Sequence, residues 1–185
     1  RSMLQMVYWI SQNIRTQLSD HLVLQQGRPN LIWGEATPGA VVTVTLEDQP
    51  PRSTRADASG RWETSLPALT VSSNPRTLSI EADGEVRVLQ DVLVGEVWLC
   101  SGQSNMEWML RQSAHGKEEL ESPDHPDLRL LHLRAGARGS GGVYREAELA
   151  RLRPGKFCEG QWEVASGDSA PEFSAVAWYF GRYLQ

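Results

Sequence analysis

Residues 95–108 read Gly95-Glu96-Val97-Trp98-Leu99-Cys100-Ser101-Gly102-Gln103-Ser104-Asn105-Met106-Glu107-Trp108. They continue an apolar run, Val92 to Cys100, whose length and β-branched content predict a strand. The run ends at Ser101-Gly102, and a short helix is predicted from Ser104 to Arg111. Glycine permits a tight turn at that point, and a helix N-terminus offers backbone N–H groups to an anion. A serine at such a strand-to-helix turn is well placed to serve as a nucleophile.

Ser104 also has a purely structural interpretation. Ser104 and Glu107 fit the Ser-x-x-Glu capping box, in which the serine hydroxyl accepts a backbone N–H of the first helical turn. Such boxes open many helices, so the spacing alone favours an N-cap over a nucleophile. The two roles can coexist in one residue.

The chain before this stretch, residues 18–92, reads as all-β. Val42, Val44 and Leu46 alternate with threonines, which predicts a half-buried strand. Asp83-Gly84 is a strong hairpin signal between two further alternating segments. Short strands separated by turns predict an antiparallel β-sandwich over these residues.

Two tryptophans in this region invite a sugar-binding interpretation. Trp33 and Trp62 lie within the alternating pattern, so we expect them in the core. A tryptophan that stacks on a sugar would have to lie on the polar face or in a loop.

Beyond residue 92 the pattern changes. The strand predicted over residues 93–100 is apolar on both faces, as in a parallel sheet. The small-residue segment 136–142 is interpreted as a surface loop, because no Lys-Ser or Lys-Thr follows it as a phosphate-binding loop requires. The remaining predicted elements are strands over 128–133 and 161–164 and a helix over 144–153.

The last predicted element is a helix over residues 172–185. Ser169 and Glu172 form a second capping box before it. We expect its apolar stripe to pack on the strand 93–100. The stripe comprises Phe173, Val176, Ala177, Phe180, Tyr183 and Leu184.

Composition excludes several classes of function. The 185 residues carry a net charge of −5, which argues against a basic nucleic-acid-binding face. No apolar run approaches the ~20 residues that span a bilayer. Residues 1–17 are treated as an N-terminal extension, and they lack the features of a signal peptide. None of the histidines lies at a recognisable zinc-ligand spacing.

The two cysteines, Cys100 and Cys158, allow one disulfide. Apolar or aromatic residues precede each of them, so two buried thiols are the alternative. We therefore expect the pair to be bridged or both thiols to be buried.

The block Val94 to Trp108 resembles the nucleophile block of the sialate O-acetylesterase family, a group of SGNH (GDSL-type) hydrolases. Residues 18–25, Leu-Ser-Asp-His-Leu-Val-Leu-Gln, and residues 172–180, Glu-Phe-Ser-Ala-Val-Ala-Trp-Tyr-Phe, also resemble the family. The resemblance covers residues 18–185 but only the front part of a family member.

The resemblance implies a mixed β and α/β fold. A β-sandwich domain over 18–92 would precede the first part of an SGNH-hydrolase-like α/β domain over 93–185. Ser104 matches the nucleophile, and its backbone N–H matches one oxyanion donor. Gly102, Gln103 and Asn105 match the rest of the block. The family's Asp-x-x-His and Gly-x-Asn blocks are absent from the sequence, so the resemblance also implies an incomplete triad.

The implied reaction is serine attack on the acetyl ester of a carbohydrate, either a sialic acid or a plant polysaccharide such as xylan. The resemblance implies no metal and no organic cofactor. Family members commonly work in a periplasm, in a lysosome or outside the cell, which a disulfide would suit. A second chain or a missing C-terminal segment would complete the α/β domain, whether the chain is truncated, a partial gene product or one subunit of a processed enzyme. The alternative function is a non-catalytic fragment with a binding or structural role.

Overall fold

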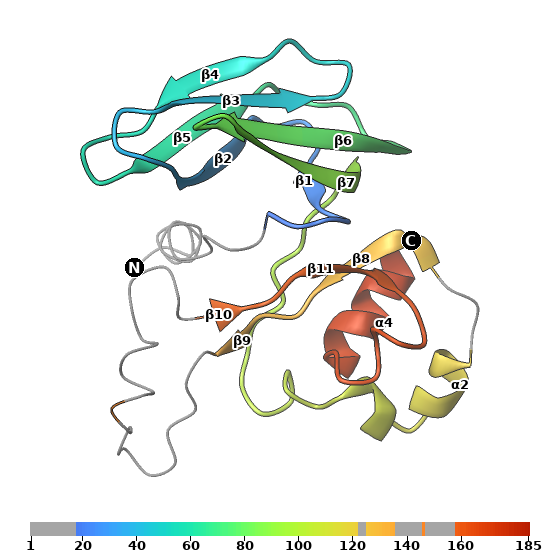
Figure 1. The fold of residues 1–185 in the computed structure, drawn as a ribbon. Helices are drawn as coiled ribbons and strands as arrows, with labels where there is room; N and C mark the ends of the chain where they lie inside the picture. Colours follow the sequence, from blue (N-terminus) through green and yellow to red (C-terminus); the bar gives the residue numbers. More distant parts are fainter. Residues whose placement is uncertain (1–17, 122–124, 136–145, 147–157) are drawn as a thin grey trace.

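The computed structural model describes residues 18–121, 125–135, 146 and 158–185. It shows a mixed fold dominated by sheets, with few helices (Figure 1). The predicted helix 144–153 and the loop 136–142 lie outside the described residues, apart from Glu146. The same is true of the extension 1–17.

The largest sheet has five strands in the order β1-β7-β6-β3-β4. Its members are β1 (Val23–Gln25), β3 (Val41–Leu46), β4 (Arg52–Arg55), β6 (Ser72–Ala82) and β7 (Glu85–Gly95). All neighbours are antiparallel except β1 and β7, which run parallel, so the sheet is not the purely antiparallel one predicted. A second sheet pairs β2 (Asn30–Glu35) with β5 (Arg61–Leu66).

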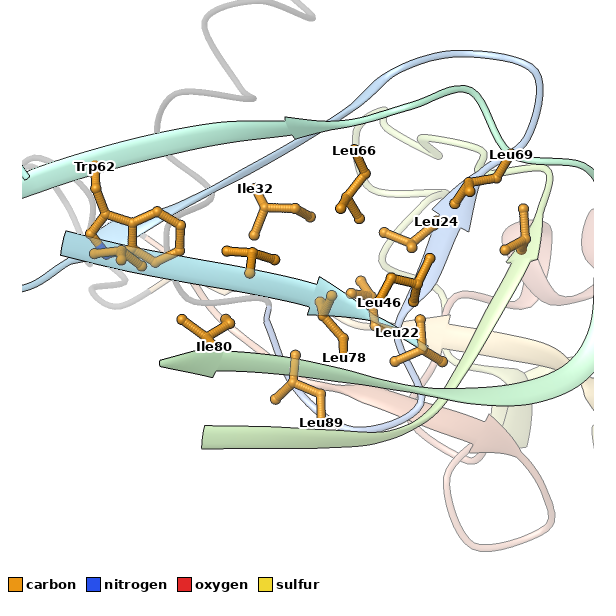
Figure 2. Close-up of a cluster of buried hydrophobic side chains, with 14 of the residues drawn as sticks. Leu22, Leu24, Ile32, Leu46, Trp62, Leu66, Leu69, Leu78, Ile80 and Leu89 are labelled. Carbon is orange, nitrogen blue, oxygen red and sulfur yellow. The ribbon is translucent and has the colours of Figure 1, made fainter. Parts of the chain in front are cut away.

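The two sheets enclose one hydrophobic core, the first core (Figure 2). Val42, Val44 and Leu46 are fully buried on one face of β3, as their alternation predicts. Asp83-Gly84 joins β6 to β7 with both residues at positive φ, as a type I′ hairpin turn requires. No helix occurs between residues 40 and 90, all of which the structure describes.

The tryptophan prediction is half right. Trp62 of β5 is buried in the first core. On β2, Ile32 is the buried residue, and the adjacent Trp33 is half-buried. Adjacent residues of a strand point to opposite faces, so Trp33 faces away from the first core.

The strand predicted over residues 93–100 is correct only for its first three residues. Residues 93–95 are the end of β7, where they pair with β1, and residues 96–100 are exposed and pair with no described strand. Val92 and Val94 bury their side chains in the first core, which explains the apolar character of the beginning of the run. Pairing partners, not the apolar run alone, decide where a strand ends.

A second core lies between β8 (His125–Leu131), β11 (Trp162–Ala165) and α4 (Ala175–Leu184) (Figure 1). The predicted strands 128–133 and 161–164 correspond to β8 and β11, which form an antiparallel pair. The smaller elements are η1 (Leu110–Gln112), α2 (Gly116–Leu120), β9 (Arg134–Ala135) and β10 (Cys158–Glu159), and β9 pairs with β10. The buried members of this core are Leu110, Leu130, Ala165, Ala170, Ala175 and Trp178.

Helix α4 differs from its prediction in its start and in its buried face. Its N-cap is Ser174, whose hydroxyl accepts the Ala177 N–H, whereas Ser169 bonds the Val164 carbonyl. Trp178 is buried, but Phe180 is 39% exposed. The helix therefore packs against β8, β11 and η1 and not against residues 93–100 as its main partner. Helical spacing fits several stripes, and the position of the partner selects one of them.

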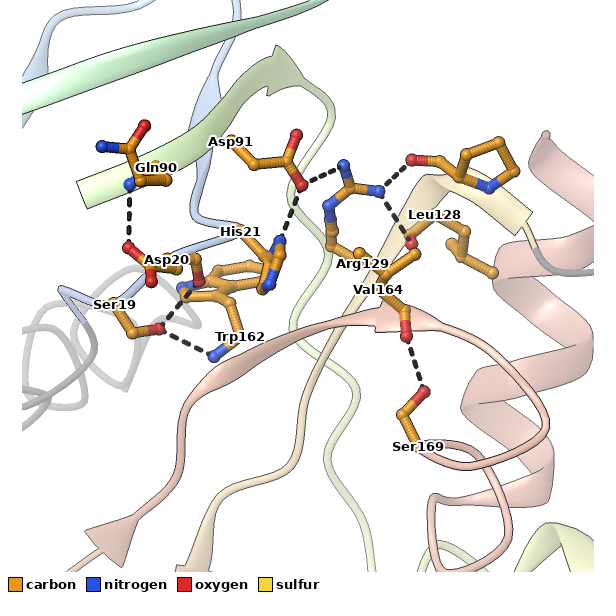
Figure 3. Close-up of polar contacts among 11 residues, drawn as sticks. Ser19, Asp20, His21, Gln90, Asp91, Leu128, Arg129, Trp162, Val164 and Ser169 are labelled. Atoms are coloured by element: carbon orange, nitrogen blue, oxygen red, sulfur yellow. Dashed lines mark hydrogen bonds and ion pairs between the residues drawn. The ribbon is translucent and has the colours of Figure 1, made fainter.

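A polar joint links β7 to β8 (Figure 3). Asp91 Oδ2 accepts from Arg129 at 2.9 Å and lies 2.6 Å from His21 Nδ1. The Arg129 side chain is 3% exposed, so its charge depends on Asp91 for compensation. The joint connects the sheet of the first core to a strand of the second.

Replacing Asp91 by asparagine is expected to lower the free energy of unfolding by about 2–3 kcal/mol, because it leaves the buried Arg129 charge uncompensated. Asparagine tolerates the positive φ of this residue, 55°, so backbone strain adds little. Urea unfolding checks the value. Glu172→Gln is the control, since Glu172 is 52% exposed and its ion pairs with Arg111 and Arg134 are surface contacts. Equal losses in the two variants would contradict the role of Asp91.

Candidate active site

The segment that leads to Ser104 is fixed at its start. The Glu96 carboxylate accepts hydrogen bonds from the side-chain amides of Gln25, at 3.0 Å, and Gln26, at 2.6 Å. These bonds lower the pKa of Glu96 below its ordinary value, because they favour the charged form. The Val97 N–H donates to Gln25 Oε1 at 2.9 Å. The end of β1 thus holds the point where the chain leaves the five-stranded sheet.

Ser104 lies in a turn and not at the start of a helix. Successive i to i+3 backbone bonds join Met106 N to Gln103 O (2.9 Å), Glu107 N to Ser104 O (3.2 Å) and Trp108 N to Asn105 O (3.3 Å). The predicted helix over 104–111 is therefore replaced by this turn and by η1. The predicted capping box is also wrong, since the Glu107 N–H bonds the Ser104 carbonyl and not its hydroxyl.

The turn is tied to the beginning of α4. The Ser174 hydroxyl donates to Met106 Sδ at 3.2 Å. Backbone bonds join Ala175 N to Trp108 O at 2.8 Å and Leu110 N to Phe173 O at 2.9 Å. Helix α4, itself anchored in the second core, thereby positions the turn that carries Ser104.

The structure brings the four predicted site residues together in one exposed loop. Gly102, Gln103, Ser104 and Asn105 are all exposed. Among the described residues, none hydrogen-bonds to the Ser104 hydroxyl, so it is free to meet a substrate. Gly102 approaches Met106 closely: a Cβ on Gly102 would lie 3.3 Å from Met106 Cβ. A glycine at this position therefore lets the turn fold back on itself.

None of the four histidines, all of which are described, hydrogen-bonds to Ser104. His21 bonds Asp91 in the joint, and His115 is exposed at the start of α2. His125 stacks edge-on against Trp178 and His132 against Phe173. The His21–Asp91 pair does not follow the Asp-x-x-His spacing, because its members are 70 residues apart in sequence.

A large apolar groove lies beside this loop. Its volume is about 1260 Å³, and residues of both cores border it. Trp98 and Phe180 meet in it edge to face, with ring centroids 5.3 Å apart. We call it the apolar groove and define it by Leu31, Trp33, Trp98, Leu128, Phe173 and Phe180.

Cys100 also borders the apolar groove. The prediction that it is bridged to Cys158 or buried is wrong. The residue is exposed and forms no disulfide. Partial burial of the thiol raises the pKa of Cys100, so the thiolate is less populated than in an ordinary cysteine. The Cys158 side chain lies outside the described part of the structure. Trp98 and Leu99, which precede Cys100, misled the prediction because they are themselves exposed.

The described residues contain no group of three or more histidine, cysteine, aspartate or glutamate side chains placed to hold a metal ion. No helix among them is long and apolar enough to cross a membrane.

Comparisons with known proteins identify similar chains. The chain is 29% identical to mouse (Mus musculus) sialate O-acetylesterase and 30% identical to the human (Homo sapiens) protein, in each case over 90% of this chain. It spans about a third of the length of these relatives, 32% and 33%. The structure matches that of a carbohydrate acetylesterase from Xanthomonas citri with a TM-score of 0.74 and 32% identity, over 92% of this chain and 36% of that one. No family model matches the sequence.

Proposed function

We propose that this chain, which is homologous to the sialate O-acetylesterases over about nine-tenths of its length, forms the nucleophile-bearing part of a carbohydrate O-acetylesterase. One observation carries the proposal: the block that resembles the family's nucleophile block lies in an exposed loop, with a free Ser104 hydroxyl. The acetylated sugar is a sialic acid or a plant polysaccharide such as xylan.

The proposed reaction is acetyl transfer to Ser104 followed by hydrolysis. The Ser104 oxygen attacks the acetyl carbonyl, a base takes the hydroxyl proton, and the Ser104 backbone N–H helps to hold the oxyanion. The sugar leaves as an alcohol, and water then cleaves the acetyl-enzyme to acetate and free serine. Gly102, Gln103 and Asn105 shape the loop. No histidine of this chain serves as the base.

We propose two domains along the chain, a β-sandwich over 18–92 and the first part of an SGNH-hydrolase-like α/β domain over 93–185. The two clusters of buried residues support this division, because the buried members of the first core end at Val94 and those of the second begin at Leu110. A non-catalytic fragment is the second candidate function, and it is favoured because no described residue hydrogen-bonds to the Ser104 hydroxyl.

A block exchange tests the proposed function. Residues 95–108 of this chain replace the aligned residues of the Xanthomonas citri carbohydrate acetylesterase, and hydrolysis of p-nitrophenyl acetate is measured. We expect the exchanged enzyme to keep its rate within about tenfold, because the block carries Ser104, the proposed nucleophile, together with its backbone N–H. A tenfold loss corresponds to about 1.4 kcal/mol of transition-state stabilisation. An exchanged enzyme that keeps the parent's melting temperature but shows no hydrolysis would overturn the proposal.

The 185-residue chain alone is expected to give no burst of p-nitrophenol from p-nitrophenyl acetate. Without a base the serine hydroxyl is a weak nucleophile, and loss of triad function costs orders of magnitude in rate. Stopped-flow absorbance at protein concentrations comparable to the ester checks this expectation. A stoichiometric burst that disappears in Ser104→Ala would contradict it and direct attention back to the four histidines.

A further inference from the structure

We propose that Arg134 binds the carboxylate of an acidic sugar beside the Ser104 loop, so that the site selects a sialic acid over an uncharged polysaccharide such as xylan. Arg111 and Glu172 support the contact: Glu172 holds the Arg134 side chain in place, and Arg111 offsets the charge of Glu172. This inference rests on the proposed function, because it names the substrate class of the same site.

Glu172 lies between the two arginines. Its Oε2 atom accepts a hydrogen bond from Arg134 Nη2 at 3.2 Å, and its Oε1 atom lies 3.9 Å from Arg111 Nη2. All three side chains reach solvent, since Arg134 is 60% exposed, Arg111 49% and Glu172 52%. Two guanidinium groups facing one carboxylate leave one positive charge without compensation.

Arg134 keeps hydrogen-bond donors for a ligand. A guanidinium group carries several N–H donors in a planar fork, and among the described residues only Glu172 hydrogen-bonds to the Arg134 side chain. A sugar carboxylate can accept two parallel N–H bonds from such a fork, which the hydroxyl groups of a neutral sugar cannot match in strength. The ion pair with Glu172 is exposed and therefore weak, so an incoming carboxylate can compete with it.

The backbone keeps Arg111 beside Glu172. The Arg111 N–H donates to the Pro171 carbonyl at 3.1 Å, directly before Glu172. The Leu110 N–H donates to the Phe173 carbonyl at 2.9 Å, directly after it. The position of the second positive charge is therefore set by paired backbone segments and does not depend on the surface ion pair alone.

The same segment reaches the turn that carries Ser104. The Ser174 hydroxyl, two residues beyond Glu172, donates to Met106 Sδ in that turn at 3.2 Å. Arg134 and Glu172 both border the apolar groove, as Met106 does. A sugar that presents its acetyl group to Ser104 can therefore present a carboxylate to Arg134.

Arg134 is the accessible arginine of the apolar groove. The other arginine that borders it, Arg129, is 3% exposed and paired with Asp91. Glu107 and Asp127 also border the groove, but neither forms an ion pair with Arg134. Because the chain as a whole carries a net charge of −5, it has no general attraction for anions. Binding of an acidic sugar then depends on this local charge.

A titration with free sugars tests the site and involves no ester. N-acetylneuraminic acid, its methyl ester, glucuronic acid and the neutral sugar xylobiose are each added to the 185-residue chain. Dissociation constants are measured from nuclear magnetic resonance shifts at low ionic strength, where exposed charges are least screened. We expect N-acetylneuraminic acid to bind about tenfold more tightly than its methyl ester or xylobiose, because both lack the charge. Shifts are expected at Arg134 Nε–H and at the amides of residues 103–107.

Matched variants assign the contact to its residues. Arg134→Gln is expected to weaken binding of N-acetylneuraminic acid about tenfold, and Arg111→Gln about threefold, because Arg111 acts only by offsetting Glu172. Glu172→Gln is expected to tighten binding about twofold or more, since it leaves both guanidinium groups without a competing carboxylate. Arg52→Gln is the control, because Arg52 is an exposed arginine of β4 outside the groove. It is expected to bind like the unmodified chain.

Several outcomes would overturn the proposal. Equal binding of the acid and its methyl ester removes the carboxylate contact, and equal binding by Arg134→Gln and Arg52→Gln removes the role of Arg134. Binding of sodium acetate as tight as that of N-acetylneuraminic acid would show a general anion site. Tighter binding of glucuronic acid would assign the site to a charged plant polysaccharide instead. Unchanged amides at residues 103–107 would place the sugar away from Ser104.

The titration and the block exchange separate the two proposals. Selective binding of N-acetylneuraminic acid together with an inactive exchanged enzyme supports the carboxylate site and overturns the proposed function alone. An active exchanged enzyme together with no selective binding overturns the carboxylate site alone, because the exchanged block, residues 95–108, contains neither Arg111 nor Arg134.

Discussion

In the block-exchanged acetylesterase, Ser104→Ala is expected to lower kcat by about 10⁴–10⁶-fold, because removing a serine nucleophile removes the covalent route. This loss corresponds to about 5–8 kcal/mol of transition-state stabilisation. The residual rate comes from substrate binding and the remaining oxyanion donors. Steady-state hydrolysis of p-nitrophenyl acetate measures the loss, and acetate release from an O-acetylated sialic acid measures it on a sugar.

The matched control is Ser101→Ala in the same exchanged block. Ser101 is a second exposed serine three residues earlier, and it is not the residue that matches the nucleophile. We expect its loss to change kcat by less than about threefold, which is under 1 kcal/mol. If Ser101→Ala and Ser104→Ala lower kcat equally, the assignment of Ser104 as the nucleophile is wrong.

Local patterns predicted the first core well. Alternation placed Val42, Val44 and Leu46 on the buried face of β3, and Asp83-Gly84 marked the hairpin between β6 and β7. Both features depend on neighbouring residues only, through side-chain alternation and the φ angles that a tight turn requires. Such information is present in a short segment of sequence.

The sequence could not predict features that depend on distant partners. Residues 96–100 have the composition of a strand, yet no described strand pairs with them. The face of α4 is selected by β8, β11 and η1, which cover Trp178 and leave Phe180 partly exposed. The His21–Asp91–Arg129 joint combines three residues that are far apart in the chain. These outcomes follow from tertiary packing and not from periodicity.

In the candidate site too, features that depend on neighbouring residues were predicted and contacts between distant residues were not. The residues of the Ser104 loop are contiguous, so the sequence placed them together and the structure keeps them together. The sequence did not predict the contacts that hold the loop in place. The side-chain amides of Gln25 and Gln26 donate to Glu96, and the Ser174 hydroxyl donates to Met106 Sδ. No spacing rule joins residues 68–71 positions apart, and a pattern in one sequence carries no signal for such contacts.

Trp178→Ala is expected to lower the free energy of unfolding by about 3–5 kcal/mol, the range for removing a buried aromatic side chain. Trp178 is 2% exposed at the centre of the second core, beside Leu110 and Leu130. Its Nε1–H donates to Glu119 at 3.0 Å, and its ring meets His125 edge to face with centroids 5.8 Å apart. Alanine leaves a cavity among these groups, and it removes the hydrogen bond that Trp178 donates to the Glu119 carboxylate.

Urea unfolding followed by far-ultraviolet circular dichroism measures the loss, and Trp108→Ala is the matched control because that tryptophan is 54% exposed. We expect the control to cost less than about 1 kcal/mol, since an exposed ring has little burial to lose. Trp178→Phe separates packing from the hydrogen bond and is expected to cost about 1–2 kcal/mol. A loss below about 1 kcal/mol for Trp178→Ala would mean that α4 is held in place by other contacts.

Because α4 anchors Met106 and Trp108, we also expect Trp178→Ala to speed amide exchange in the turn that carries Ser104.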